Sequence, residues 1–122
     1  KPARLLDSAP ESDWIEYTVG QKARTYIIPI FNHGRIRFPC GNGPDHGIWK
    51  GRITLDFDKF PGLRDTELEA YRVTFQDPKI QLTPVRIAKD RNGASIKLAV
   101  DKREELVVGP KGLAKNEFFY GR

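Results

Sequence analysis

The glycine-rich segment of residues 39–47 concentrates the side chains best suited to chemistry. Cys40 is the only cysteine, His46 is one of two histidines, Asp45 lies beside it, and His33 lies a few residues upstream. These residue types can ligate zinc, and a cysteine beside a histidine can act as a nucleophile. Structural zinc sites, however, usually recruit two closely spaced ligand pairs, which this segment lacks. We therefore favour a turn between two strands and predict no metal site and no cofactor. A loop that contacts a ligand without chemistry is the other interpretation.

The rest of the sequence contains no catalytic signature. It has no phosphate-binding glycine loop ending in Lys-Ser/Thr, no Cys-x-x-Cys pair, no His-Glu-x-x-His motif and no Gly-x-Ser-x-Gly elbow. Asp56 and Asp58 alternate with Phe57, so their carboxylates share one face of a predicted strand and could serve acid–base chemistry. We interpret them as part of a solvated acidic surface. The prediction is a protein without catalytic residues.

Six basic residues share one arrangement, in which each neighbours apolar residues on a predicted strand. They are Arg35 and Arg37, Lys50 and Arg52, and Arg86 and Lys97. Successive side chains of a strand point to opposite faces, so these cations belong to a face away from the core. If their strands are neighbours, the cations form a stripe that can neutralise phosphates. Tyr17, Tyr26 and Phe31 are candidate base-stacking side chains, as in small barrels that bind single strands.

The charge of the chain is unevenly distributed around a net formal charge of +5 and a pI of about 9.5. Residues 21–55 carry six basic side chains against Asp45 alone, and residues 78–122 carry ten against five acidic ones. Residues 1–20 and 56–77 are acidic overall. A positive face favours anionic partners. Many proteins of similar pI bind no polyanion. The charge is therefore compatible with an anionic partner and equally with a basic surface that binds none.

Size and composition fit a single domain. The sequence has 122 residues, and its aromatic residues (two Trp, four Tyr and seven Phe) compensate for an apolar fraction of 39%. One cysteine permits no intrachain disulfide, and no apolar run approaches the ~20 residues of a membrane-spanning helix. The sequence contains no methionine, so Lys1 is not expected to be the translated start. A cleaved signal peptide stays open. Localisation is unknown, with a cytoplasmic or virion-assembly setting favoured.

Alternation of apolar and polar residues predicts about six or seven short strands. It is clearest over residues 48–58, where Trp49, Ile53, Leu55 and Phe57 share one face. The other strands are expected over residues 14–19, 25–31, 35–38 and 71–75 and in a hairpin around residue 92. Pro29 has no N–H, so its strand is expected at a sheet edge or with a bulge.

Asn92-Gly93 predicts the tip of that hairpin, as a type I′ turn in which both positions tolerate positive φ. A two-residue loop there places Ile87 opposite Leu98 on an apolar face. At most two short helices are also expected. One covers residues 61–70, and the other covers residues 101–108, where Asp101 and Glu104 have the spacing of a capping box.

These elements predict an all-β, mainly antiparallel fold, a small barrel or sandwich with one or two short helices. Residues 1–12 are expected to form a polar arm, residues 13–108 a single β domain, and residues 109–122 a tail. The aromatic cluster of that tail, Phe118, Phe119 and Tyr120, should dock on this chain or on a neighbouring copy.

Two functions are compatible with this organisation. The first is a non-catalytic module that binds nucleic acid, single-stranded in our hypothesis, through the six cations. The alternative is a structural or assembly subunit, such as a component of a viral or other multi-copy particle, with docking terminal arms. The partners would be nucleic acid or further copies of the chain, and no membrane.

Overall fold

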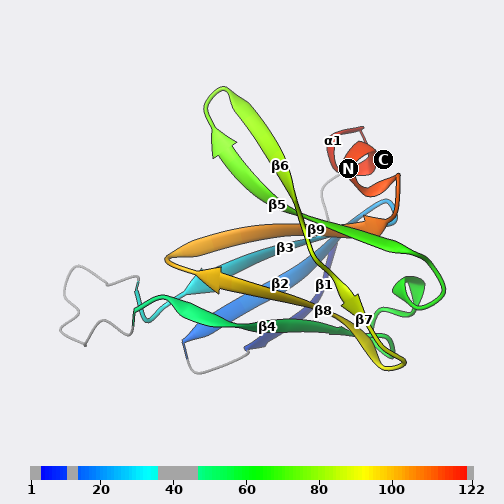
Figure 1. The fold of residues 1–122 in the computed structure, drawn as a ribbon, viewed down its shortest axis with the longest axis horizontal. Coiled ribbons are helices and arrows are strands. Elements are labelled where there is room, and N and C mark those ends of the chain that lie inside the picture. Colours follow the sequence, from blue (N-terminus) through cyan, green and yellow to red (C-terminus); the bar gives the residue numbers. More distant parts are fainter. Residues whose placement is uncertain (1–3, 11–13, 36–46, 121–122) are drawn as a thin grey trace.

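The protein is built from two antiparallel sheets packed face to face, as the computed structural model shows for residues 4–10, 14–35 and 47–120 (Figure 1). The large sheet has the strand order β1-β2-β3-β9-β5-β6, and the small sheet has the order β4-β8-β7. The all-β prediction is confirmed. Of the two predicted architectures the sandwich fits, and the described strands form no closed barrel.

The elements follow one another in this order. They are β1 (Arg4–Pro10), β2 (Ile15–Lys22), β3 (Thr25–Asn32), β4 (Trp49–Asp56), the 3-10 turn η1 (Pro61–Leu63), β5 (Leu68–Gln76), β6 (Lys79–Val85), β7 (Ala88–Lys89), β8 (Gly93–Val100), β9 (Arg103–Pro110) and the helix α1 (Ala114–Tyr120).

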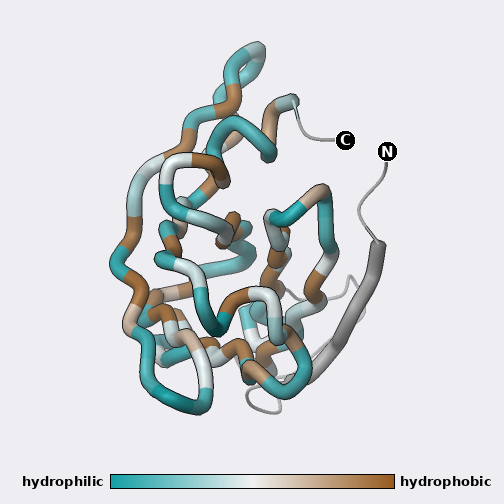
Figure 2. The backbone as a smooth tube through the Cα atoms, turned by 90° about the vertical axis from the view of Figure 1, so that its right-hand side faces the viewer, coloured by the Kyte–Doolittle hydropathy of each residue, from teal (hydrophilic) through white to brown (hydrophobic). Residues whose placement is uncertain are grey.

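The main core lies between the two sheets, and strand alternation explains its composition. Ile15, Tyr17 and Val19 of β2 are buried, whereas the residues between them are more exposed. The small sheet contributes Ile53 and Leu55 of β4 in the same way. The face predicted for residues 48–58 is therefore confirmed, and hydrophobic and hydrophilic residues are interspersed along the backbone in Figure 2.

A second, smaller core lies on the outer face of the large sheet, where α1 packs. It consists of Val73, Val107 and Ala114, with Phe118 packed against them. Glu117 fixes the helix to the turn between β2 and β3. Its carboxylate accepts hydrogen bonds from Thr25 Oγ1 at 2.9 Å and from the Arg24 backbone N–H at 3.0 Å. Part of the predicted tail is thus a helix anchored to the sheet.

A buried asparagine links the sheets at the end of β3. Asn32 Nδ2 donates hydrogen bonds to the carbonyl oxygens of Val100 and Gly47, both at 3.1 Å, and its Oδ1 accepts one from the Gly34 N–H at 3.0 Å. No buried side-chain polar atom in the described part of the chain lacks a partner. The turn at residues 32–34 therefore has a defined structural role.

Three local predictions were wrong. Residues 61–70 form only η1 before β5 begins, and residues 103–110 form β9, a central strand rather than a helix. Leu106, Val107 and Val108 are buried consecutively, because one face of β9 meets the core and the other meets α1; this two-sided burial outweighs a capping box. Residues 4–10, expected in a loose arm, form β1 and pair with β2.

Pro29 was expected at a sheet edge or in a bulge, but β3 lies inside the large sheet between β2 and β9. Pairing of β2 with β3 is recorded from Ile15 to Tyr17 and again from Gly20 to Lys22, in an unchanged register. The interruption lies opposite Pro29, which has no N–H to donate. On its other side, Pro29 pairs with Glu105 of β9.

The predicted hairpin exists, but its register differs by two residues. Lys89, rather than Arg91, pairs with Ala94. The predicted pairing of Ile87 with Leu98 is therefore wrong, although a shift of two preserves the face, and both side chains pack against the main core. The first arm is short because β6, just before it, pairs with β5 in the large sheet.

The hairpin turn is closed by Asp90, whose carboxylate accepts hydrogen bonds from the N–H groups of Asn92 at 2.7 Å and Gly93 at 2.9 Å. Neither Asn92 nor Gly93 has a positive φ, so the turn is not type I′. Glycine is needed at position 93 for space: a Cβ there would lie 2.7 Å from the carbonyl oxygen of Leu55.

Candidate anion-binding face

Four cations gather on the solvent face of the small sheet. Arg52 of β4 and Lys97 of β8 are direct cross-strand partners, and both are exposed. The pairing of Ala88 with Ser95, continued by two residues, places Arg86 level with Lys97. Lys50 is the next outward residue of β4, opposite Ala99. Four of the six predicted cations are thus brought together on one face.

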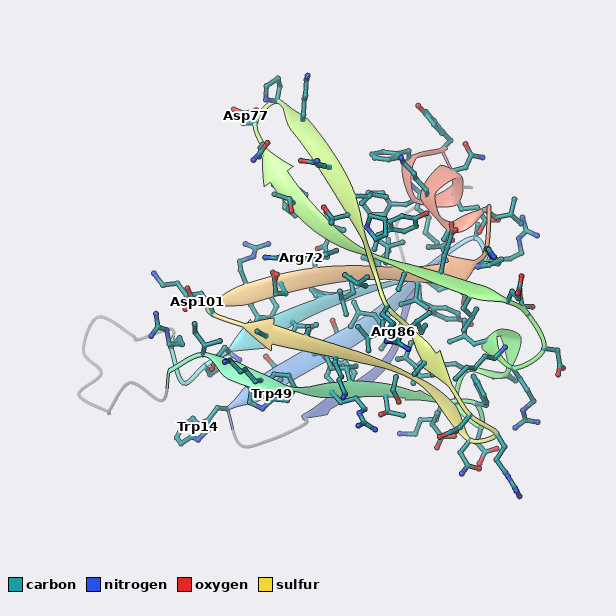
Figure 3. The ribbon with its side chains drawn as sticks, in the orientation of Figure 1. Trp14, Trp49, Arg72, Asp77, Arg86 and Asp101 are labelled. Atoms are coloured by element: carbon teal, nitrogen blue, oxygen red, sulfur yellow. The ribbon has the colours of Figure 1, made fainter. Side chains whose placement is uncertain are left out.

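The centre of this face is an open groove of about 470 Å³, which we call the basic groove. Its charged and hydroxyl-bearing lining residues are Arg52, Arg86, Lys89, Asp90, Ser95 and Lys97. Lys50, Arg52 and Lys97 also line an adjoining depression. Figure 3 shows Arg86 between β6 and β7, beside the small sheet.

The electrostatics of the basic groove are strongly positive. The side chains of Arg52, Arg86 and Lys97 make no ion pair or hydrogen bond with the described part of the chain. Asp90 is the only acidic lining residue, and hydrogen bonds from the backbone N–H groups of Asn92 and Gly93 lower its pKa. Its carboxylate is occupied by the turn. Three cations therefore remain without a counter-charge in one place, which favours an anionic ligand.

Three residues of this region were not predicted from the sequence: Lys89, and the hydroxyl-bearing residues Thr54 and Ser95 on the solvent face of the small sheet. Lys89 Nζ donates a hydrogen bond to the Thr66 carbonyl at 2.6 Å and lies 5.7 Å from the centre of the Phe57 ring. Thr54 and Ser95 approach to 3.1 Å between their hydroxyl oxygens. The same strand parity that selected Arg52 and Lys97 also marks Thr54 and Ser95 as outward, so their positions were predictable.

One of the predicted cations, Arg35, does not join the basic groove. Arg35 follows β3, is half-buried, and its Nε lies 2.8 Å from Asp101 Oδ1. Asp101 follows the end of β8 and is well separated from Arg86 in Figure 3. Arg37 lies outside the described residues, as does most of the predicted strand 35–38. Of the five predicted cations that the structure describes, four therefore gather on the small sheet and Arg35 does not.

The predicted stacking residues do not face the basic groove. Tyr17 and Tyr26 are buried in the main core, and Tyr26 packs edge-on against Phe60 at 5.5 Å between ring centres. Burial also raises the Tyr26 pKa. Phe31 faces away from the small sheet, 5.9 Å from the Arg103 guanidinium. Base stacking by Tyr17 and Tyr26 was a wrong prediction, because inward parity on β2 and β3 commits both rings to the core.

The terminal aromatics divide between core and surface. Phe118 is half-buried and packs against the smaller core, whereas Phe119 and Tyr120 are exposed, Tyr120 by 75%. Lys22 Nζ donates a hydrogen bond to the Phe118 carbonyl at 2.8 Å. Phe118 therefore docks on the chain itself. Docking of Phe119 and Tyr120 on a partner stays a prediction.

Those of the other candidate residues that the structure describes lie outside the basic groove. Cys40, Asp45 and His46 lie outside the described residues, and His33 Nε2 lies 3.0 Å from Glu16 Oε1. No group of three or more potential metal ligands occurs among the residues that the structure describes. Asp56 Oδ1 accepts a hydrogen bond from the Asp58 N–H at 2.9 Å, which caps a turn.

Comparison with known proteins gives no relative: no protein-family model, curated protein or solved structure matches this chain. Within the described ranges, no helix is long and apolar enough to cross a membrane.

Proposed function

We propose that the basic groove binds the phosphate backbone of a nucleic acid without catalysing a reaction. The observation that carries this proposal is the convergence of Arg52, Arg86 and Lys97, none of them neutralised by a neighbouring carboxylate. Holding like charges together is unfavourable for the free protein. A polyanion removes this repulsion and releases counterions when it binds.

The composition of the groove favours contacts to phosphates over contacts to bases. Among its lining residues there is no aromatic ring on which a base could stack. Phosphate contacts carry no sequence information, so binding is expected to be similar for strands of different sequence. A single strand is the preferred ligand, because its backbone can adapt to an open, shallow groove.

The test is a fluorescence-anisotropy titration of labelled oligonucleotides against the protein at several salt concentrations. With three or four phosphate contacts, the log–log dependence of affinity on salt should have a slope of about −2 to −3 for a single strand. Arg52→Glu and Arg86→Glu should each weaken binding about tenfold, equivalent to about 1.4 kcal/mol. Lys115→Glu, on the exposed face of α1, is the matched control and should bind like the parent protein.

Two results would contradict the proposal. One is no binding at about 50 mM salt, where phosphate contacts are strongest. The other is an equal loss of affinity in Lys115→Glu and Arg52→Glu, because net charge rather than the groove would then govern binding. A duplex of the same sequence, titrated in parallel, decides between single and double strands.

The alternative function, a structural or assembly subunit, is favoured by a different observation. The hairpin of β5 and β6 carries exposed Phe75 and Ile80 at its tip, and α1 exposes Phe119 and Tyr120. Each pair of neighbouring exposed apolar side chains is a candidate contact with another protein. The two functions are compatible, since the basic groove lies on the other sheet.

A further inference from the structure

Strand β6 is an open edge of the large sheet. Its one recorded partner is β5, and no described strand lies along its other side. The β5–β6 hairpin projects beyond the body of the molecule in two perpendicular views (Figures 1 and 2). Lys79 is the only charged residue of β6. Natural sheets protect their edges with charges, prolines or covering segments. In β6 these devices, Lys79 and Pro84, lie toward its two ends and leave residues 80–83 open to pairing.

Pro84 indicates which backbone groups of β6 face outward. It pairs with Tyr71 inside an uninterrupted ladder, and a proline in an edge strand turns its donorless nitrogen toward the free side. By the two-residue period, Ile80 and Leu82 also turn their N–H and C=O groups outward. The free edge therefore offers two donors, bounded by Pro78 and Pro84, which have none.

This edge is self-complementary about Gln81. Pro78 and Pro84 lie three residues on either side of it, so a two-fold axis through Gln81 places Pro84 of one copy opposite Pro78 of the other. No donor is then wasted on a proline. In the same register Ile80 lies opposite Leu82 of the second copy, and the two residues can exchange both backbone hydrogen bonds.

The side chains match in the same register. Within one chain, Phe75 pairs with Ile80, and Val73 pairs with Leu82. Phe75 is 56% exposed and Ile80 is 44% exposed, whereas Val73 is buried and Leu82 half-buried. Edge pairing would continue the exposed row of one copy into the buried row of the other, covering apolar surface on both. The opposite face of the paired strands carries polar residues, and there Gln81 of one copy lies beside Gln81 of the other.

We infer that two copies of this chain pair antiparallel through β6, with the two-fold axis at Gln81. A second copy is favoured over a different strand by charge as well as by symmetry, because the nearly neutral edge has little to offer a charged partner. The resulting sheet is continuous across both copies, and both basic grooves stay free. The inference is independent of the proposed function.

The first experiment measures oligomeric state by size-exclusion chromatography with light scattering at tens of micromolar. The parent protein should be a dimer. Ile80→Lys, which places a charge in the apolar row, should be a monomer with an unchanged circular dichroism spectrum. Ile48→Lys makes the same change at a residue 52% exposed that lies outside β6, and it should remain a dimer.

The second experiment tests the register by oxidative crosslinking in a Cys40→Ser background. Gln81→Cys places the two cysteines of a dimer at a non-hydrogen-bonded cross-strand pair, in which the two Cα atoms are about 4.5 Å apart. This variant should crosslink efficiently. Thr83→Cys is the matched control: two copies of residue 83 would lie four residues apart along the strands, about 13 Å, beyond the reach of a disulfide.

The inference is overturned if the parent protein is a monomer at every concentration, or if Ile80→Lys and Ile48→Lys behave alike. It is also overturned if Thr83→Cys crosslinks as well as Gln81→Cys, since the pairing would then have another register or another surface. Loss of oligonucleotide binding in an intact dimer would count against the basic groove alone.

Discussion

Arg52 and Lys97 lie directly opposite each other on β4 and β8, with both side chains on the solvent face of the small sheet. Like charges at directly opposite positions destabilise a pair of strands. Neither side chain has an acidic partner in the part of the chain that the structure describes. This arrangement is unfavourable for folding and favourable for holding an anion.

The substitution Lys97→Glu should therefore have effects of opposite sign on stability and on binding. It converts the repulsive pair into an attractive one, and the free energy of unfolding should rise by about 0.2–1 kcal/mol. The same change should weaken oligonucleotide binding about tenfold, or about 1.4 kcal/mol. Urea denaturation and an anisotropy titration measure the two effects. Lys50→Glu, opposite Ala99, should weaken binding without gaining that cross-strand attraction.

Removing the carboxylate of Glu117 should release α1 from the sheet. The Arg24 backbone N–H and the Thr25 hydroxyl would lose their acceptor, and the Arg24 guanidinium would lose its ion pair. Unpartnered buried groups of this kind cost about 1–3 kcal/mol, so Glu117→Ala should lower the free energy of unfolding by about 2–3 kcal/mol in total. Thermal and urea denaturation test this.

The matched control for that substitution is Glu67→Ala. Glu67 is exposed, and its Oε2 lies 3.9 Å from Lys111 Nζ. A surface ion pair of this type contributes at most about 0.5–1 kcal/mol. An equal loss of stability in Glu67→Ala and Glu117→Ala would mean that burial at Glu117 has no special role.

Acid should weaken the β7–β8 hairpin through Asp90. The pKa of this carboxyl is lowered below its ordinary value of 3.8, chiefly by the hydrogen bond from the Asn92 N–H and then by that from Gly93. A lowered pKa in the folded state contributes stability above the ordinary value, and this contribution is lost as the pH falls through the lowered value. Asp90→Asn keeps an oxygen acceptor but does not titrate.

The measurement is the urea midpoint at neutral pH and at several values below 3.8. The parent protein should lose more stability over this range than Asp90→Asn, and a nuclear magnetic resonance titration should place the Asp90 midpoint below the ordinary value. Identical pH profiles for the two proteins would show that the turn hydrogen bonds do not stabilise the folded carboxylate.

The sequence by itself determined the faces of the strands. Alternation is a local property, because each successive side chain points to the other side of the backbone. Ile53 and Leu55 were therefore recognisable as core, and Arg52 as outward, from β4 alone. A hairpin near Asn92 was equally recognisable, since the turn residues and the flanking apolar residues both place a chain reversal there.

Only the tertiary structure decided which strands are neighbours. The outward positions of Arg35 and Arg52 look alike in the sequence, yet Arg35 pairs with Asp101 while Arg52 meets Lys97. The same limit explains the hairpin register, because a shift of two residues keeps every side chain on its predicted face. Two contacts stabilise the observed register: the turn hydrogen bonds to the Asp90 carboxylate, and the close approach of the Leu55 carbonyl to Gly93.

The largest failure of sequence reasoning was β9, for a related physical reason. Its polar start, Arg103 to Glu105, resembles the first turn of a helix, and burial of Val107 on the outer face depends on α1, which comes later in the chain. Glu104 is also paired with Arg72 of β5, distant in sequence. Local alternation assigns a side chain to a face, but contacts between distant segments decide what covers that face, and those contacts exist only in the folded chain.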